Sequence, residues 1–194
     1  MPFPYRRLSV VGTSGFGKST LAEKLAHRLK VTFVELDALH WEPGWKPAEI
    51  TVFRRRVDEA TREPGWAVAG NYSRVRDIIW ARAQAVVWLD YPFGIGLWRL
   101  VKRTLLRAVR REELWNGNRD LFYPHLKFWS DESLIVWYFK TYGRRKREYP
   151  QLFSLPEYAH LNVIHLRTPQ DADSWLENLS PLSKVGVGDS SDGQ

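Results

Sequence analysis

The sequence predicts one α/β domain with a parallel β-sheet, and three observations support this prediction. Five short apolar runs recur along the 194 residues, with helical patterns between most of them, and strands that alternate with helices are typical of parallel sheets. A glycine-rich segment lies between the first run and the first helical pattern, an order of strand, loop and helix that suits phosphate binding. The length supports one well-buried core, whereas two full domains would each be small.

The composition narrows the cellular setting and the partners. Hydrophobic residues make up 44% of the chain and charged residues 26%, and no apolar stretch approaches the ~20 residues that a membrane-spanning helix needs. The N-terminal residues lead into the first strand without a secretory signal, and the lack of cysteine fits a reducing compartment, so we expect a cytoplasmic protein. The net charge of +7 favours polyanionic partners, which include both nucleotides and nucleic acids.

The first strand, at 8–11, is followed by GTSGFGKS at 12–19, which fits the pattern G-x-x-x-x-G-K-[ST]. Glycines let the backbone curl so that several N–H groups converge on phosphates at the positive end of the next helix, predicted at 20–29. We therefore expect ATP to be bound by Gly12, Thr13, Ser14, Gly15, Phe16, Gly17, Lys18, Ser19 and Thr20.

Two side chains of this segment have further roles. Lys18 would reach the outer phosphates and take part in catalysis, and Ser19 offers a hydroxyl to Mg²⁺, which binds through few protein ligands. The pattern thus predicts ATP and Mg²⁺ as cofactors and does not identify the molecule that receives the phosphate.

The second strand, at 31–36, ends beside two acids, Glu35 and Asp37. A period of two would put both carboxylates on one face of the strand, at the edge where parallel sheets bind ligands. Asp37 could orient or deprotonate an acceptor hydroxyl, and Glu35 could hold a magnesium-bound water; the alternative is two solvated acids. The aromatic stretch 38–46 follows, and we expect His40 and Trp41 to contact the acceptor.

A helix is predicted at 48–62, a third strand at 66–69 and a second helix at 74–83. Gly70 and Asn71 lie between the last two, where a glycine lets a substrate approach backbone N–H groups. We assign both residues, with Arg76, to the acceptor site; a plain strand-to-helix turn is an equal alternative.

The fourth strand, at 85–89, is an apolar run closed by Asp90. This is the form of a second nucleotide motif that steadies Mg²⁺, so Asp90 is a candidate metal ligand alongside Ser19 and Glu35. Asp90 is also a residue type that favours a turn, here before Tyr91 and Pro92, and the two interpretations are equally supported.

The helix predicted at 93–111 is strongly basic. Arg99, Arg103, Arg107 and Arg110 fall on one face, and guanidinium groups suit phosphoryl oxygens. We expect Arg103 and Arg107 to stabilise the transferred phosphoryl group from a closing lid. The alternative is a solvated basic face.

Residues 112–127 contain Asn116-Gly117-Asn118 among aromatic side chains and predict a mobile excursion where a lid would lie, before more helix to about 147. The basic run 144–147 could extend this basic surface, and we favour the alternative, a solvated helix end. A last strand is predicted at 161–166 and a helix at 169–179, and residues 180–194 are expected to be disordered.

Taken together, these motifs resemble the P-loop kinases related to adenylate kinase, and within them bacterial proteins often labelled DNA topology modulation protein. The resemblance covers about the first 170 residues and rests on five segments: GTSGFGKST at 12–20, ELDALHWEPGW at 35–45, GNYSRVRDIIW at 70–80, VVWLDYPF at 86–93 and RTLLRAVRREELWNGNRD at 103–120.

The resemblance implies a P-loop NTPase fold over 1–179: three α/β/α layers, a five-stranded parallel sheet in the order 2-3-1-4-5, and a lid at about 103–127. By position, Arg103, Arg107, Arg111 and Arg119 match the lid, and the last two would contact ATP. The third strand ends in Gly-Asn-Tyr-Ser-Arg where adenylate kinases have Asp-Gly-Phe-Pro-Arg, so AMP is not the favoured acceptor. Asp37 is similar to the acid of shikimate and gluconate kinases.

The predicted function is therefore ATP- and Mg²⁺-dependent transfer of the γ-phosphate to a small molecule or nucleotide. The alternative is an ATP-binding, nucleic-acid-associated regulator that uses the basic helix at 99–111. The sequence identifies neither the acceptor nor the oligomeric state.

Overall fold

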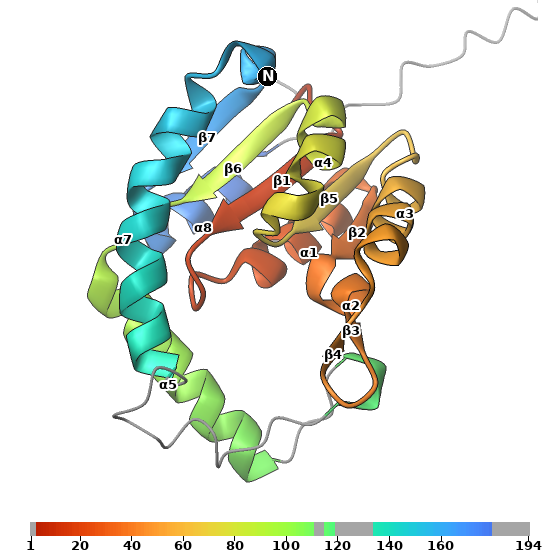
Figure 1. Cartoon of the computed structure of the whole chain (residues 1–194). Helices are drawn as coiled ribbons and strands as arrows, with labels where there is room; N and C mark the ends of the chain where they lie inside the picture. Colours follow the sequence, from red (N-terminus) through yellow and green to blue (C-terminus); the bar gives the residue numbers. More distant parts are fainter. Residues whose placement is uncertain (1–2, 111–114, 119–133, 180–194) are drawn as a thin grey trace, which may run out of the picture.

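A five-stranded parallel sheet forms the centre of the protein (Figure 1). The computed structural model describes residues 3–110, 115–118 and 134–179. The strands are β1 (Arg7–Gly12), β2 (Thr32–Glu35), β5 (Trp66–Ala69), β6 (Ala85–Leu89) and β7 (Asn162–Leu166). Their order is β2-β5-β1-β6-β7, and numbering only these five along the chain gives 2-3-1-4-5, which confirms the predicted order.

Helices cover both faces of the sheet, so the three-layer prediction is confirmed (Figure 1). On one face lie α1 (Lys18–Leu29) and α8 (Pro169–Glu177), and on the other α3 (Ile50–Ala60) and α4 (Arg76–Arg82). Each face has its own apolar cluster. On the first face, α1 contributes the residues that it buries at helical spacing, which are Leu21, Ala22, Leu25, Ala26 and Leu29. None of the helices that the structure describes combines the length and apolar character needed to cross a bilayer.

Two long helices, α5 (Phe93–Arg110) and α7 (Leu134–Phe153), extend beyond the carboxyl edge of the sheet (Figure 1). The Tyr138 hydroxyl on α7 donates to the Phe93 carbonyl at 3.0 Å. Gly96 permits this approach, since a Cβ there would clash with the Tyr138 hydroxyl and the Phe16 ring. α7 runs past its predicted end near 147 because Tyr149, one turn from the helix end, is buried against the sheet.

Two small elements after β2 were not predicted: α2 (Leu36–His40) and the hairpin of β3 (Trp41–Glu42) and β4 (Lys46–Pro47). A five-residue helix is too short to show a period, and the hairpin turn depends on positive φ angles at Gly44 (75°) and Trp45 (57°). The chain thus leaves the sheet at Glu35. The prediction that Glu35 and Asp37 share one strand face is wrong, because Asp37 lies in α2.

Part of the predicted lid lies outside the described residues, including Arg111 and Arg119, as does the predicted tail at 180–194. Arg107 lies on α5, where the structure describes its backbone. Within the lid region, the short helix η2 (Trp115–Gly117) and Asn118 are described. A final short helix, η3 (Pro156–Tyr158), connects α7 to β7, and η1 (Ser73–Val75) precedes α4.

Candidate active site

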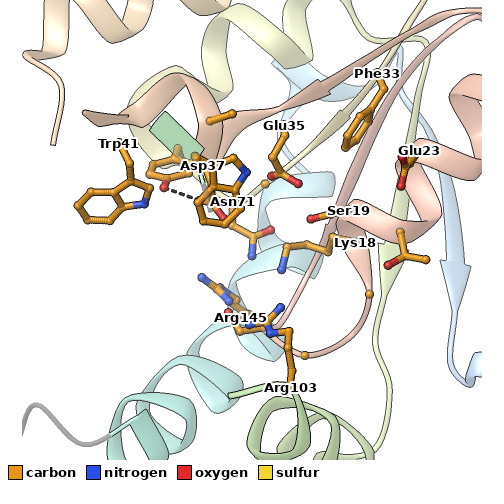
Figure 2. A pocket seen from close by; sticks show the side chains of 18 residues that line it. Lys18, Ser19, Glu23, Phe33, Glu35, Asp37, Trp41, Asn71, Arg103 and Arg145 are labelled. Carbon is orange, nitrogen blue, oxygen red and sulfur yellow. Dashed lines mark hydrogen bonds between the residues drawn. The ribbon is translucent and has the colours of Figure 1, made fainter. Parts of the chain in front are cut away.

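A cavity of about 800 Å³ opens at the carboxyl edge of the sheet. Its walls come from the loop after β1, the end of β2 with α2, the segment after β5, and the helices α5 and α7 (Figure 2). Ligands of open α/β sheets bind at this edge, because loops diverge there between neighbouring strands. The topology therefore gathers residues from distant parts of the chain around one space.

The phosphate loop, Gly12 to Ser19, enters this cavity between β1 and α1. Three of its glycines have positive φ angles, 145° at Gly12, 83° at Gly15 and 84° at Gly17, so the curl depends on glycine as predicted. Gly17 precedes α1, and no side chain in the described residues caps this helix. The first N–H groups of α1 are thus left for a ligand, which is the arrangement of anion sites at helix N-termini.

The predicted loop residues divide into two groups. Lining residues are Ser14, Gly15, Gly17, Lys18, Ser19 and Thr20. Gly12, Thr13 and Phe16 are buried instead, and the Phe16 ring lies 4.9 Å from that of Tyr91. The side chains of Thr13 and Phe16 anchor the loop to the protein interior.

Three cations converge on the cavity: Lys18 from α1, Arg103 from α5 and Arg145 from α7 (Figure 2). The Lys18 ammonium donates to the Thr13 carbonyl at 3.2 Å. Burial, followed by the charge of Arg145, lowers the pKa of Lys18 to about 7, although Asp37 acts in the opposite direction. Burial also lowers the pKa of Arg145. Cations that are disfavoured in the free protein gain stabilisation when a polyanion enters.

Nucleotide binding should therefore be accompanied by proton uptake. At about pH 8.5 Lys18 in the free protein is mostly neutral, because its pKa is about 7, and phosphate oxygens would raise that pKa toward the ordinary value. Calorimetric titration of ATP without metal, in buffers of different ionisation enthalpy, should show uptake approaching one proton. Heats that do not depend on the buffer would contradict this expectation.

Ser19 and Glu35 lie together at the mouth of the phosphate loop (Figure 2). Burial raises the pKa of Glu35, and a hydrogen bond from the Ser19 hydroxyl lowers it. The described residues contain no group of three or more His, Cys, Asp and Glu side chains that could hold a metal by themselves. One carboxylate beside one hydroxyl fits Mg²⁺, which takes its other oxygen ligands from water and phosphate.

Asp90, the third predicted metal ligand, is held elsewhere. Its carboxylate lies 3.1 Å from His165 Nε2 and 4.0 Å from Lys146 Nζ, and the His165 ring stacks on Trp88 at 4.1 Å. Because the neighbouring strand and α7 engage this acid, the structure does not bring it together with Ser19 and Glu35.

Asp37 faces the cavity from α2 (Figure 2), and Tyr72 holds its carboxylate. The Tyr72 hydroxyl donates to Asp37 Oδ1 at 2.6 Å, and burial raises the pKa of Tyr72. Trp41 and Gly70 line the same wall. Gly70 (φ 140°) allows the chain to pass close to Leu36, which would lie 2.8 Å from an added Cβ.

Two other predicted acceptor residues lie behind this wall. The His40 ring packs against Trp41, Phe53 and Tyr72 at centroid distances of 4.8, 4.8 and 4.6 Å, and burial lowers its pKa. Arg76 pairs with Glu148 at 2.9 Å and lies 5.4 Å from the Trp80 ring centre. His40 therefore supports Tyr72, and Arg76 joins α4 to α7.

Sequence reasoning gave the Tyr72 side chain no role of its own and favoured a solvated position for Arg145. Both line the cavity. A signal for Arg145 was available: it follows Tyr138 and Thr141 and precedes Tyr149 at helical spacing, and all three are buried. The basic run at 144–147 obscured this period, because its other members point to different sides of the helix.

The outer wall is joined to the lid region by asparagines. Asn118 is 3% exposed; its Nδ2 donates to the Glu42 carbonyl at 2.9 Å, and its Oδ1 accepts from the Trp45 N–H at 2.9 Å. Asn116 donates to the Trp41 carbonyl at 2.5 Å, and Trp115 reaches the cavity. The β3–β4 hairpin and the segment 115–118 thus form one wall.

Replacing Asn118 with alanine should loosen this wall without unfolding the domain. Two hydrogen bonds are lost, which corresponds to about 1–3 kcal/mol of docking free energy. Hydrogen exchange of the Trp45 amide should accelerate about tenfold or more. The matched control is Asn178→Ala, which removes a 2.8 Å bond to the Ser174 carbonyl at the exposed end of α8. Unchanged exchange at Trp45 would contradict the role of Asn118.

Comparison with solved structures finds kinases of similar fold. A gluconokinase from Sinorhizobium meliloti 1021 aligns over 91% of this chain and 94% of its own, with 18% identity and a TM-score of 0.49. A shikimate kinase from Bacteroides thetaiotaomicron aligns over 89% and 94%, with 16% identity and a TM-score of 0.44. Protein-family models and curated proteins gave no match, and nothing found supports the DNA topology label. At these values the likeness carries no argument about function, which has to be argued from the site.

Proposed function

We propose that the protein is a kinase that transfers the γ-phosphate of ATP to a hydroxyl group of a small molecule, with Mg²⁺ as cofactor. One observation carries this proposal: the phosphate loop, three cations and the Asp37 carboxylate face one another across a single cavity. A site with cations at one end and a held carboxylate at the other has the parts that phosphoryl transfer to a hydroxyl needs.

The cationic end would hold the triphosphate. Backbone N–H groups of the loop and Lys18 would bind the phosphates, and Arg103 and Arg145 would stabilise charge on the equatorial oxygens during transfer. Arg107, Arg111 and Arg119 are proposed to add to this from the lid. Ser19 and Glu35 would hold Mg²⁺, which when bound supplies charge neutralisation on the phosphate oxygens.

The carboxylate end would hold the acceptor. Tyr72 fixes Asp37 by a 2.6 Å hydrogen bond, so the acid is oriented before a substrate arrives. The acceptor oxygen bonds to the γ-phosphorus as the bond to the bridging oxygen breaks, and the hydroxyl proton passes to Asp37. Trp41, Gly70 and Trp115 would enclose the rest of the acceptor.

A second hollow, of about 360 Å³, supports a place for the nucleoside. It is lined by Arg99, Pro169 and Tyr91, and it shares Gly15, Gly17 and Thr20 with the main cavity. A nucleotide whose phosphates follow the loop could therefore extend its base into this hollow.

The test is a screen for the acceptor. The protein is given Mg-ATP with pooled hydroxyl metabolites, nucleosides and nucleotides, and ADP release is followed while pools are divided. The proposal expects ADP formation that requires one component and yields its phosphate ester. ADP formation that no component changes would contradict transfer to a small molecule. Stimulation by DNA, with a binding constant whose logarithm falls with log salt concentration at a slope of about −0.9 per phosphate contact, would favour the nucleic-acid alternative.

A further inference from the structure

The side chain of Asn71 joins the phosphate loop to α7. Its Nδ2 donates to the Gly12 carbonyl at 2.5 Å, and its Oδ1 accepts from the Gly12 N–H at 3.2 Å. The same oxygen accepts from the Tyr149 hydroxyl at 2.9 Å. The side-chain amide of Asn71 is thus hydrogen-bonded to both the N–H and the carbonyl of Gly12, the residue that begins the phosphate loop.

These bonds extend the sheet by one step. β5 pairs with β1 up to Ala69 opposite Val10, and the Gly70 N–H donates to the Val10 carbonyl at 3.4 Å. The backbone then turns away at Gly70, whose φ is 140°. An asparagine amide offers the same donor and acceptor as a peptide group, so Asn71 continues the ladder to Gly12 after the strand has ended.

Gly12 is fixed on its other side by β6. It pairs with Leu89 in the parallel register, and a Cβ at Gly12 would lie 2.5 Å from the Leu89 carbonyl oxygen. Leu89 contacts Gly12 on one side and Asn71 bonds to it on the other, so the peptide groups at the start of the phosphate loop are held in one orientation. The direction of the following N–H groups depends on that orientation.

The bond from Tyr149 attaches α7 to the same point. Tyr149 is 4% exposed, and its ring lies 5.9 Å from that of Trp88 on β6. It follows Arg145 by one helical turn, so the two side chains share a face of α7. Arg145 lines the cavity beside Lys18 (Figure 2).

We propose that Asn71 is a positioning residue that sets the place of Arg145 relative to the phosphate loop. Asn71 also lines the cavity, so this role is additional to the acceptor contact predicted for it, and it rests on the proposed function only in that the loop and Arg145 bind one nucleotide. Asn71 acts through Gly12 on one side and through Tyr149 on the other.

A double-mutant cycle on nucleotide affinity tests this role. Calorimetry with Mg-ATP compares wild type, Asn71→Ala, Arg145→Ala and the double variant. Asn71→Ala should weaken binding about tenfold in the wild-type background and about threefold or less when Arg145 is already absent, because coupled residues are not additive. Asn178→Ala is the matched control and should leave affinity unchanged.

A gentler variant keeps the test decisive if Asn71→Ala does not fold. Tyr149→Phe removes only the hydroxyl and keeps the ring packing, so it should weaken affinity several-fold in the presence of Arg145 and hardly at all in its absence. Additive effects, or a fall in melting temperature with unchanged affinity, would overturn the proposal. Failure of the proposed function is distinguishable, since wild type itself would then bind no nucleotide, and the inference would fall with it.

Discussion

Replacing Lys18 with methionine is expected to lower phosphoryl transfer about 10³-fold, measured as ADP release with the acceptor identified by the screen. The ammonium is the cation that α1 presents at the loop, and removing one preorganised charge from a water-poor site has effects of about this size. Affinity for Mg-ATP should fall as well, because Lys18 would contact the phosphates before and during transfer.

The stability of the same variant should move in the opposite direction. Lys18 shares the cavity with Arg103 and Arg145, and burial lowers its pKa to about 7, so the charged form destabilises the free protein at pH below that value. Lys18→Met should therefore keep or raise the melting temperature, most clearly near pH 6. Arg55→Met, which alters an exposed ion pair on α3, is the control. A Lys18 variant with full turnover would contradict the assignment.

Replacing Asp37 with asparagine is expected to lower turnover by about 10²–10⁴-fold while Mg-ATP affinity stays within about twofold. The amide oxygen can still accept the Tyr72 hydrogen bond, so the wall keeps its shape, but the group can no longer take the acceptor proton. Initial rates over a range of acceptor concentrations separate turnover from binding.

The control for this variant is Asp77→Asn. Asp77 is an exposed acid that pairs with Arg54 at 2.6 Å, away from the cavity, and its replacement should leave turnover unchanged. Equal losses of nucleotide affinity and turnover in Asp37→Asn would remove the proposed role of Asp37, because they would show an effect on the phosphate end.

The fold could be predicted because its signals are local. β5 and β6 have the predicted bounds, since each is a short apolar run between turn residues. The phosphate loop is equally local: its glycines are needed for positive φ angles, and the sequence order of strand, loop and helix is the spatial order. Lys18 and Ser19 could therefore be assigned without knowledge of the rest of the chain.

Other parts of the site depend on packing between distant elements. Asp37 lies in α2 and not on a strand, because one turn of helix replaces the predicted strand end. Asp90 contacts His165, which lies on a strand more than seventy residues later. Arg145 reaches the cavity because Tyr138 and Tyr149 set the rotation of α7. Neither acid leaves a short-range pattern that separates its arrangement from that of a solvated acid, and the helical spacing of Arg145 with its buried neighbours was obscured by the basic run at 144–147.

The cavity at the carboxyl edge of the sheet is proposed to receive a nucleoside triphosphate. Isothermal titration of Mg-ATP into the wild-type protein at low salt measures this binding. We predict saturable binding of one nucleotide per chain, strongly weakened in Lys18→Met and retained in Asp37→Asn. Absence of saturable binding in the wild type, or equal binding by wild type and Lys18→Met, would contradict this proposal.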